Sequence, residues 1–168
     1  MCVMLPAKHA EFLIQQLNVL IVDDNQYMRK IVRGLLLNIG VKGLHEAEDG
    51  IAGLEIVRTL SPDVVILDWE MPLLNGPEFV RIVRSPGVFP TPDLPIIMLT
   101  GYRERWRVME AARLGINEFL CKPVSLKALH QRLMSIVANP RTSVQIGDYY
   151  GPAPRLPGKL PEDISAFG

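Results

Sequence analysis

The stretch Val64–Asp68 (VVILD) decides the fold, because four consecutive apolar residues end directly in a carboxylate. A short, uninterrupted apolar run of this kind is typical of a strand buried on both faces of a parallel sheet. Three similar runs each end in polar residues: Val19–Val22 before Asp23-Asp24, Ile96–Leu99 before Thr100, and Glu118–Cys121 before Lys122. Ligands of open α/β sheets bind beyond the carboxyl ends of the strands, so we expect these polar side chains to converge.

Helical patterns alternate with the strands, which predicts an α/β fold with a doubly wound, five-stranded parallel sheet and five flanking helices. The fifth strand is a short one near Val41–Ala47. Helices are expected after Asn25, Gly50 and Gly76, over about 103–114, and over about 125–137.

The two ends of the chain differ from its middle. Residues 1–16 are predicted to be an N-terminal extension with a helical turn near Ala10–Leu17, and residues 17–139 to be the folded domain. Residues 140–168 carry five prolines and four glycines, a composition that predicts a tail without a second domain. Within that tail, Asp148–Pro152 (DYYGP) is either a docking strip or a loosely packed end.

The bulk composition excludes several classes of protein. A hydrophobic content of 48% and a mean hydropathy of +0.17 indicate a globular chain rather than a disordered one. Eighteen basic and eighteen acidic residues cancel, which argues against a nucleic-acid partner. Apolar runs are too short to span a bilayer, and two cysteines make neither a disulfide framework nor a metal cluster. We therefore expect a cytoplasmic protein with no membrane partner.

The converging side chains indicate a particular chemistry. Either Asp23 or Asp24 alone could be a turn former or a helix cap. Three carboxylates together are different, because two charges ~4 Å apart repel by about 4 kcal/mol at an effective dielectric constant of about 20. Such a site implies a cation, and oxygen ligands with room for phosphate favour Mg²⁺. Lys122 and Thr100 could then contact a phosphoryl group.

Four segments resemble, in order and spacing, the motifs of bacterial response regulator receiver domains: VLIVDDN (19–25), DWEMP (68–72), LTG (99–101) and Lys122-Pro123. The resemblance covers about three quarters of the chain. Within the family, residues 27–33, 46–50 and 68–69 are most similar to the CheY-like members. The resemblance implies a flavodoxin-like fold and a stand-alone receiver.

The resemblance also implies roles for matching residues. Asp68 would be the phosphoacceptor, Lys122 would pair with the phosphoryl group, and Thr100 would bind it and draw its loop inward. Asp24 and Asp68 would ligate Mg²⁺ directly, Asp23 mostly through water, and Glu70 through its backbone carbonyl. Phe119 matches the aromatic residue that turns inward on activation.

The chain departs from the family pattern at two positions beside the site. Glu70 places a carboxylate side chain next to the acceptor, and Tyr102 lies two residues after Thr100. Both would border the path of the hydrolytic water. Trp106 is expected to point outward from its helix, either as an ordinary exposed aromatic residue or as part of a partner-binding face.

The leading hypothesis is a single-domain response regulator in a phosphorelay. It would accept a phosphoryl group on Asp68 from a sensor histidine kinase or a histidine phosphotransfer protein and switch its binding to a downstream protein. It would catalyse only its own phosphorylation and dephosphorylation, as a monomer or weak dimer. The alternative from another class is a phosphohydrolase with an aspartyl-phosphate intermediate, although Glu70 stands where such enzymes usually carry a second Asp. A degenerate receiver is disfavoured because all five core positions are present.

Overall fold

The computed structural model describes residues 6–101 and 105–154. Its centre is a five-stranded parallel sheet in the order β2-β1-β3-β4-β5. The strands are β1 (Asn18–Val22), β2 (Gly43–Ala47), β3 (Val64–Asp68), β4 (Ile96–Thr100) and β5 (Glu118–Cys121). The predicted sheet is confirmed. All five residues of β3 and of β4 are buried, as their continuous apolar sequence requires.

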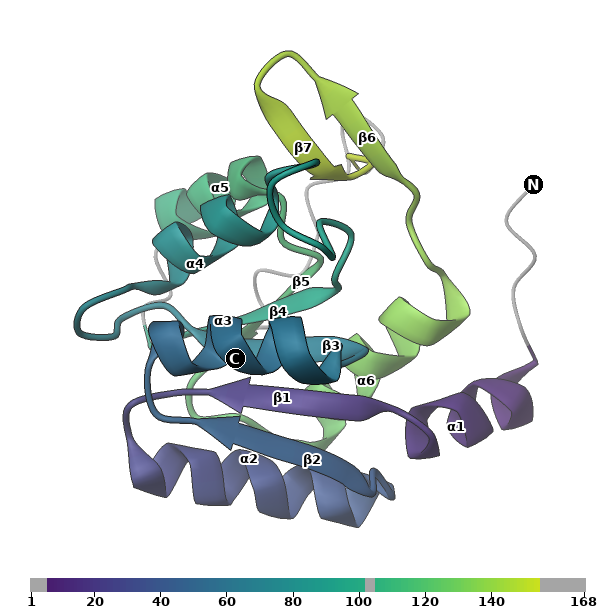
Figure 1. The fold of residues 1–168 in the computed structure, drawn as a ribbon. Helices are drawn as coiled ribbons and strands as arrows, with labels where there is room; N and C mark the ends of the chain where they lie inside the picture. The colour runs from purple at the N-terminus through teal and green to yellow at the C-terminus, as the bar shows by residue number, and fades with distance from the viewer. Residues whose placement is uncertain (1–5, 102–104, 155–168) are drawn as a thin grey trace.

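Helices cover both faces of the sheet (Figure 1). They are α2 (Gln26–Ile39), α3 (Gly50–Leu60), α4 (Gly76–Val83), α5 (Arg105–Leu114) and α6 (Leu126–Ala138). Alternate strand residues enter two separate cores, since successive side chains point to opposite faces. On β1, Val22 joins the core that contains Phe79 of α4, whereas Ile21 joins the core that contains Leu36 of α2. No helix in the described ranges is long and apolar enough to cross a membrane.

Side-chain caps fix where the helices begin and therefore where the loops above the sheet run. The Asn25 side chain accepts hydrogen bonds from the backbone N–H groups of Tyr27 and Met28, which starts α2 directly after the acidic pair. Asn75 and Glu78 form a capping box at the start of α4. Gly40 ends α2 in the left-handed conformation with φ of 106°.

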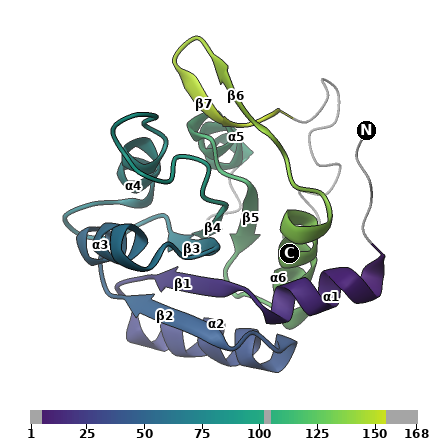
Figure 2. The ribbon, with the colours of Figure 1, turned by 45° about the vertical axis from the view of Figure 1, so that its right-hand side comes forward.

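A sixth helix, α1 (Ala7–Gln15), precedes the sheet and packs against α6 (Figure 2). The five predicted flanking helices are α2–α6, and the helical turn predicted in this extension is a nine-residue helix. Ala10 and Ile14 of α1 are fully buried, and Ile14 belongs to the core between α2 and α6. The His130 ring on α6 also meets the Glu11 carboxylate at 2.6 Å. The extension is therefore a packed part of the fold.

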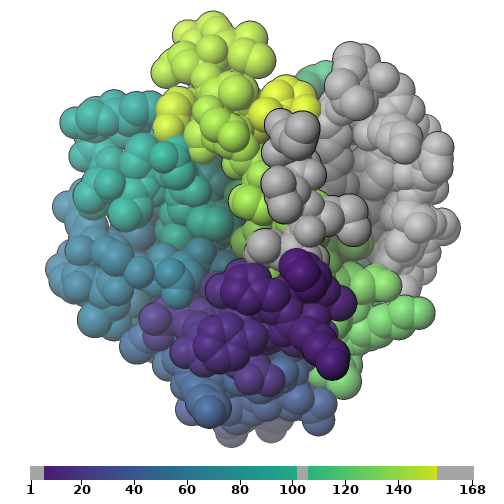
Figure 3. Space-filling model, turned by 90° about the vertical axis from the view of Figure 1, so that its right-hand side faces the viewer, coloured from purple at the N-terminus to yellow at the C-terminus, as the bar shows by residue number. Residues whose placement is uncertain are grey.

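Residues 143–152 form an antiparallel hairpin, β6 (Ser143–Ile146) and β7 (Tyr149–Pro152), where the sequence predicted only a tail. Its turn is Gly147-Asp148, and Gly147 has φ of 59°. The hairpin packs near the end of α5, and Tyr150 hydrogen-bonds Asp93. Figure 3 shows the hairpin and α1 on one side of the molecule. The Asp148–Pro152 strip is thus mostly β7, and residues 155–168 lie outside the described ranges.

Arg84 is a buried cation at the amino ends of β4 and β5, between the hairpin and the sheet. It donates hydrogen bonds to the Gly115 carbonyl at 2.8 Å, the Pro92 carbonyl at 2.7 Å and the Asn117 side-chain oxygen at 3.1 Å. Burial lowers the pKa of Arg84 to about 10, so it stays charged at neutral pH. This network ties together the loops at the amino-terminal edge of the sheet.

Candidate functional site

Three carboxylates meet at the carboxyl-terminal edge of the sheet. Asp68 is the last residue of β3, and Asp23 and Asp24 follow β1, the neighbouring strand. One carboxylate oxygen from each lies within 4.8 Å of the other two. Asp23 is fully buried and Asp68 nearly so, whereas Asp24 is exposed. The predicted convergence is confirmed.

Lys122 brings a positive charge to this cluster from the end of β5. Its Nζ lies 2.9 Å from Asp68 Oδ1 and 3.6 Å from Asp23 Oδ2. The Lys122 backbone N–H also donates to the Thr100 carbonyl, which holds the ends of β4 and β5 together. Thr100 is buried at the end of β4. One lysine thus faces three acids.

The buried position of the cluster shifts the pKa values of its acids and its lysine. Burial is the main cause that raises the pKa of Asp68 to about 6, and the nearby Asp23 and Asp24 add to it, while Lys122 opposes it. Burial likewise raises the pKa of Asp23. Burial lowers the pKa of Lys122, but its hydrogen bond and charge interactions with Asp68 and Asp23 outweigh this and raise it overall. Asp68 and Asp23 therefore hold their protons more tightly than exposed aspartates do, mainly because they are buried.

Asp23 gives a geometric sign that a cation fits here. Its Oδ1 accepts a hydrogen bond from the Asn25 backbone N–H at 2.8 Å. Among the described residues, its buried Oδ2 has no hydrogen-bond partner, and the Lys122 ammonium lies 3.6 Å from it. An all-oxygen set with an unsatisfied buried carboxylate oxygen suits a hard divalent cation such as Mg²⁺.

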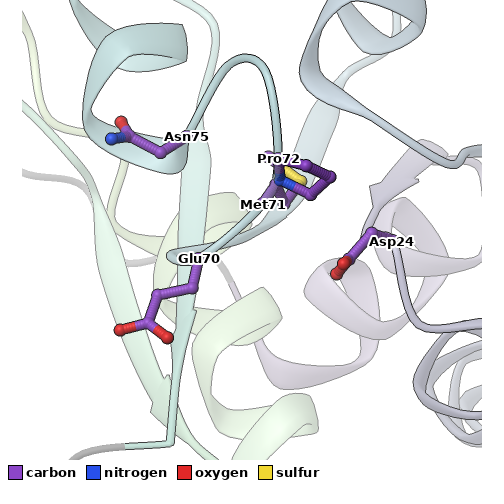
Figure 4. A pocket seen from close by; sticks show the side chains of 5 residues that line it. All are labelled: Asp24, Glu70, Met71, Pro72 and Asn75. Carbon is purple, nitrogen blue, oxygen red and sulfur yellow. The ribbon is translucent and has the colours of Figure 1, made fainter.

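The loop after β3 bends back over Asp68. The Gly76 backbone N–H donates to the Trp69 carbonyl at 2.9 Å. A Cβ added at Gly76 would lie 2.6 Å from the Asp68 carbonyl oxygen, so only glycine allows this approach. A hollow of about 460 Å³ opens beside the acids (Figure 4). It is lined by Asp24, Glu70, Met71, Pro72 and Asn75.

The comparisons with known proteins agree with this geometry. Residues 19–134 match the family model described as the response regulator receiver domain. The chain belongs to this family. The chemotaxis protein CheY-3 of Vibrio cholerae is 33% identical over 122 residues, covering 73% of this chain and 92% of that protein. CheY of Pseudomonas aeruginosa is 32% identical over 120 residues, covering 71% and 95%.

Solved structures of receiver proteins have the same fold. A structure of Vibrio cholerae CheY4 aligns with a TM-score of 0.62 at 31% identity, covering 70% of this chain and 96% of that one. A response regulator structure from Chloroflexus aurantiacus aligns with a TM-score of 0.67 at 28% identity, covering 73% and 98%. The chain is a CheY-like response regulator receiver of two-component signalling. Such receivers are signal transducers that interact with histidine kinases and downstream targets.

Two further predicted receiver residues lie on β5 and on α5. Phe119 of β5 is buried, three residues before Lys122. Trp106 is 56% exposed on α5, as the sequence predicted. Tyr102 and the residues up to 104 lie outside the described ranges, so the predicted effect of Tyr102 stays a prediction.

Sequence reasoning missed one charged side chain near the receiver site. Arg107 of α5 binds the Glu70 carboxylate, with Nη1 3.0 Å from Oε1. It was overlooked because a contact across 37 residues leaves no local sequence pattern. The one sequence feature that could have pointed to Arg107 is its position next to Trp106, in a helix that begins soon after Thr100.

Proposed function

We propose that this receiver accepts a phosphoryl group on Asp68 from a phosphohistidine of a sensor histidine kinase or a histidine phosphotransfer protein. One observation carries the proposal: the buried Asp68 carboxylate lies against Lys122 and beside two further acids, one of which, Asp24, lines an open hollow. An Asp68 oxygen would attack phosphorus, the phosphorus–nitrogen bond would break, and the imidazole would leave with its electron pair. The product is an acyl phosphate on Asp68.

Each neighbouring group has a part in this proposal. Asp24 and Asp68 would ligate Mg²⁺ directly, Asp23 mostly through water, and Glu70 through its backbone carbonyl. Bound Mg²⁺ supplies positive charge that offsets the incoming phosphoryl oxygens. Lys122 would move its ammonium from Asp68 to the phosphoryl group, as a point charge suited to phosphate.

The output of the proposed switch is a change in protein binding. The phosphoryl group adds charge and three acceptor oxygens, and Thr100 and Lys122 gain contacts only when it is present. Thr100 would draw its loop inward and Phe119 would follow. The altered surface would include Trp106, which contacts a downstream protein. The protein would act in the cytoplasm, as a monomer or weak dimer.

The only catalysis proposed is the receiver's own phosphorylation and dephosphorylation. A phosphohydrolase would need a mobile general acid two residues after the nucleophile, and Glu70 at that position is paired with Arg107. Sustained turnover of a small phosphate ester would contradict this assignment.

Labelling with acetyl phosphate and Mg²⁺, followed by intact-mass analysis, tests the acceptor. Wild type should gain one phosphoryl group. Asp68→Asn should gain none, because an amide does not attack phosphorus. Asp148→Asn, an exposed acid in the hairpin turn, is the matched control and should label like wild type. Equal labelling of Asp68→Asn would place the acceptor elsewhere.

A further inference from the structure

Within the described part of the chain, three neighbours hold Arg107 beside the proposed phosphorylation site. Its Nη1 lies 3.0 Å from Glu70 Oε1. Its guanidinium carbon lies 5.5 Å from the centre of the Trp69 ring and 5.2 Å from the centre of the Trp106 ring. Its side chain is only 15% exposed. A cation placed over two indole rings and bound to a carboxylate has little freedom to move.

Glu70 is the group whose position this contact controls. It lies two residues after Asp68 and lines the same hollow as Asp24. Figure 4 shows its carboxylate turned away from Asp24. Its side chain is 58% exposed, so Arg107, rather than burial, keeps it on that side. Without Arg107, the Glu70 carboxylate would add a fourth negative charge beside a site in which one lysine already faces three acids.

We propose that Arg107 is a positioning residue for phosphoryl transfer: it neutralises Glu70 and holds its carboxylate out of the path of the phosphodonor. The inference rests on the proposed function, because it assumes that an anionic donor enters this hollow. Arginine suits the task because a planar guanidinium binds a carboxylate and stacks on aromatic rings at once, whereas a lysine ammonium is a flexible point charge.

The expected size of the effect follows from the charges. A released Glu70 would repel a doubly charged donor across water-exposed space, which corresponds to a rate loss of roughly three- to tenfold at low salt. The same negative charge would attract a divalent cation and tighten Mg²⁺ binding by a similar factor. Both effects should shrink as salt screens the charges.

The test compares Arg107→Gln in two backgrounds, with Glu70 present and with Glu70→Gln. The initial rate of Asp68 labelling by acetyl phosphate should fall roughly three- to tenfold with Glu70 present. With Glu70→Gln, the same substitution should change the rate by less than about twofold, since no charge remains to be neutralised. Arg107→Lys should recover part of the rate. Arg113→Gln, an exposed arginine on the same helix, is the charge-matched control and should stay within about twofold of wild type.

A second measurement needs no phosphodonor. Mg²⁺ titration followed by tryptophan fluorescence, in a Trp106→Phe background so that Trp69 alone reports, should show tighter binding for Arg107→Gln only when Glu70 is present. An equal rate loss in both backgrounds would overturn the inference, because Arg107 would then only support α5. An unchanged rate and unchanged Mg²⁺ affinity would overturn it too. If wild type itself is not labelled, the proposed function fails, and the Mg²⁺ titration still decides the role of Arg107.

Discussion

At the amino-terminal edge of the sheet, the buried cation Arg84 meets three oxygen acceptors between 2.7 and 3.1 Å away. At the carboxyl-terminal edge, Lys122 is shared between two of three acids, and Asp23 Oδ2 has no hydrogen bond among the described residues. Satisfied polar networks rigidify a fold, whereas incompletely satisfied ones mark places that await a ligand. The amino-terminal edge of the sheet therefore stabilises the fold, whereas the carboxyl-terminal edge carries the groups suited to binding a ligand.

Removing Arg84 should have the largest effect on stability. Arg84→Ala removes the donor of the Gly115 and Pro92 carbonyls and, among the described residues, leaves the Asn117 amide oxygen with only the Ile96 backbone N–H. We therefore expect a loss of about 3–4 kcal/mol in the free energy of unfolding. Denaturant unfolding measures it. Arg81→Ala, at an exposed position of α4, the helix that ends just before Arg84, should change stability by less than about 0.5 kcal/mol. A loss below about 1 kcal/mol for Arg84→Ala would show that the network contributes little.

At the carboxyl-terminal edge, by contrast, removing a charged side chain should raise the free energy of unfolding. Burial raises the pKa of Asp68 to about 6, so the folded state holds this proton more tightly than the unfolded state. Stability is therefore lost as pH rises through about 6, and Asn in place of Asp does not share that loss. With chelator present, Asp68→Asn should be more stable than wild type by about 1–2 kcal/mol near neutral pH, after allowing for solvent screening and the lost Lys122 contact.

The pH dependence checks the cause of that gain. The advantage of Asp68→Asn should shrink as pH falls below about 6, where the folded acid takes up its proton, and level off only below about pH 4, where the unfolded acid is protonated too. Urea unfolding at a series of pH values with chelator would measure it. A variant less stable than wild type at neutral pH would mean that the Lys122 contact outweighs the cost of burying the charge.

The smallest expected effect comes from a substitution in α2, away from both edges of the sheet. Gly34 is exposed in the middle of α2, and an added Cβ would meet no atom within 4 Å. Gly34→Ala should therefore raise stability by about 0.5–1 kcal/mol without altering Asp68 labelling. Gly40→Ala is the contrasting control and should lose stability, because Gly40 has φ of 106° and its Cβ would approach Gln15. Thermal unfolding separates the two, and equal shifts would contradict the reasoning.

The parts of the fold that the sequence predicted well are those with local causes. The apolar run 64–68 became a fully buried strand, and Asn25 and Gly40 cap α2 as their chemistry requires. The acidic cluster was predictable because strand ends in a parallel sheet must meet at one edge.

The missed parts have other causes. Overall proline and glycine content obscured the Gly147-Asp148 turn, although a glycine-aspartate pair between short strands is itself a hairpin signal. In α1, Ala10 and Ile14 were buried by a partner, α6, that lies more than a hundred residues away. Arg84 and Arg107 act across 31 and 37 residues, and no local pattern predicts such contacts.

Because α1 and the residues next to the hairpin pack against the receiver fold, a fragment cut at the limits of the family match would lose part of that packing. The family match ends at residue 134, inside α6, and begins after α1. A fragment excised at those limits would keep every residue proposed for phosphoryl transfer. It would also strip Ile14 from the core and remove Arg141, which binds the Asn117 carbonyl at 2.6 Å. The stretch that matches the receiver family is therefore shorter than the stretch that packs together in this structure.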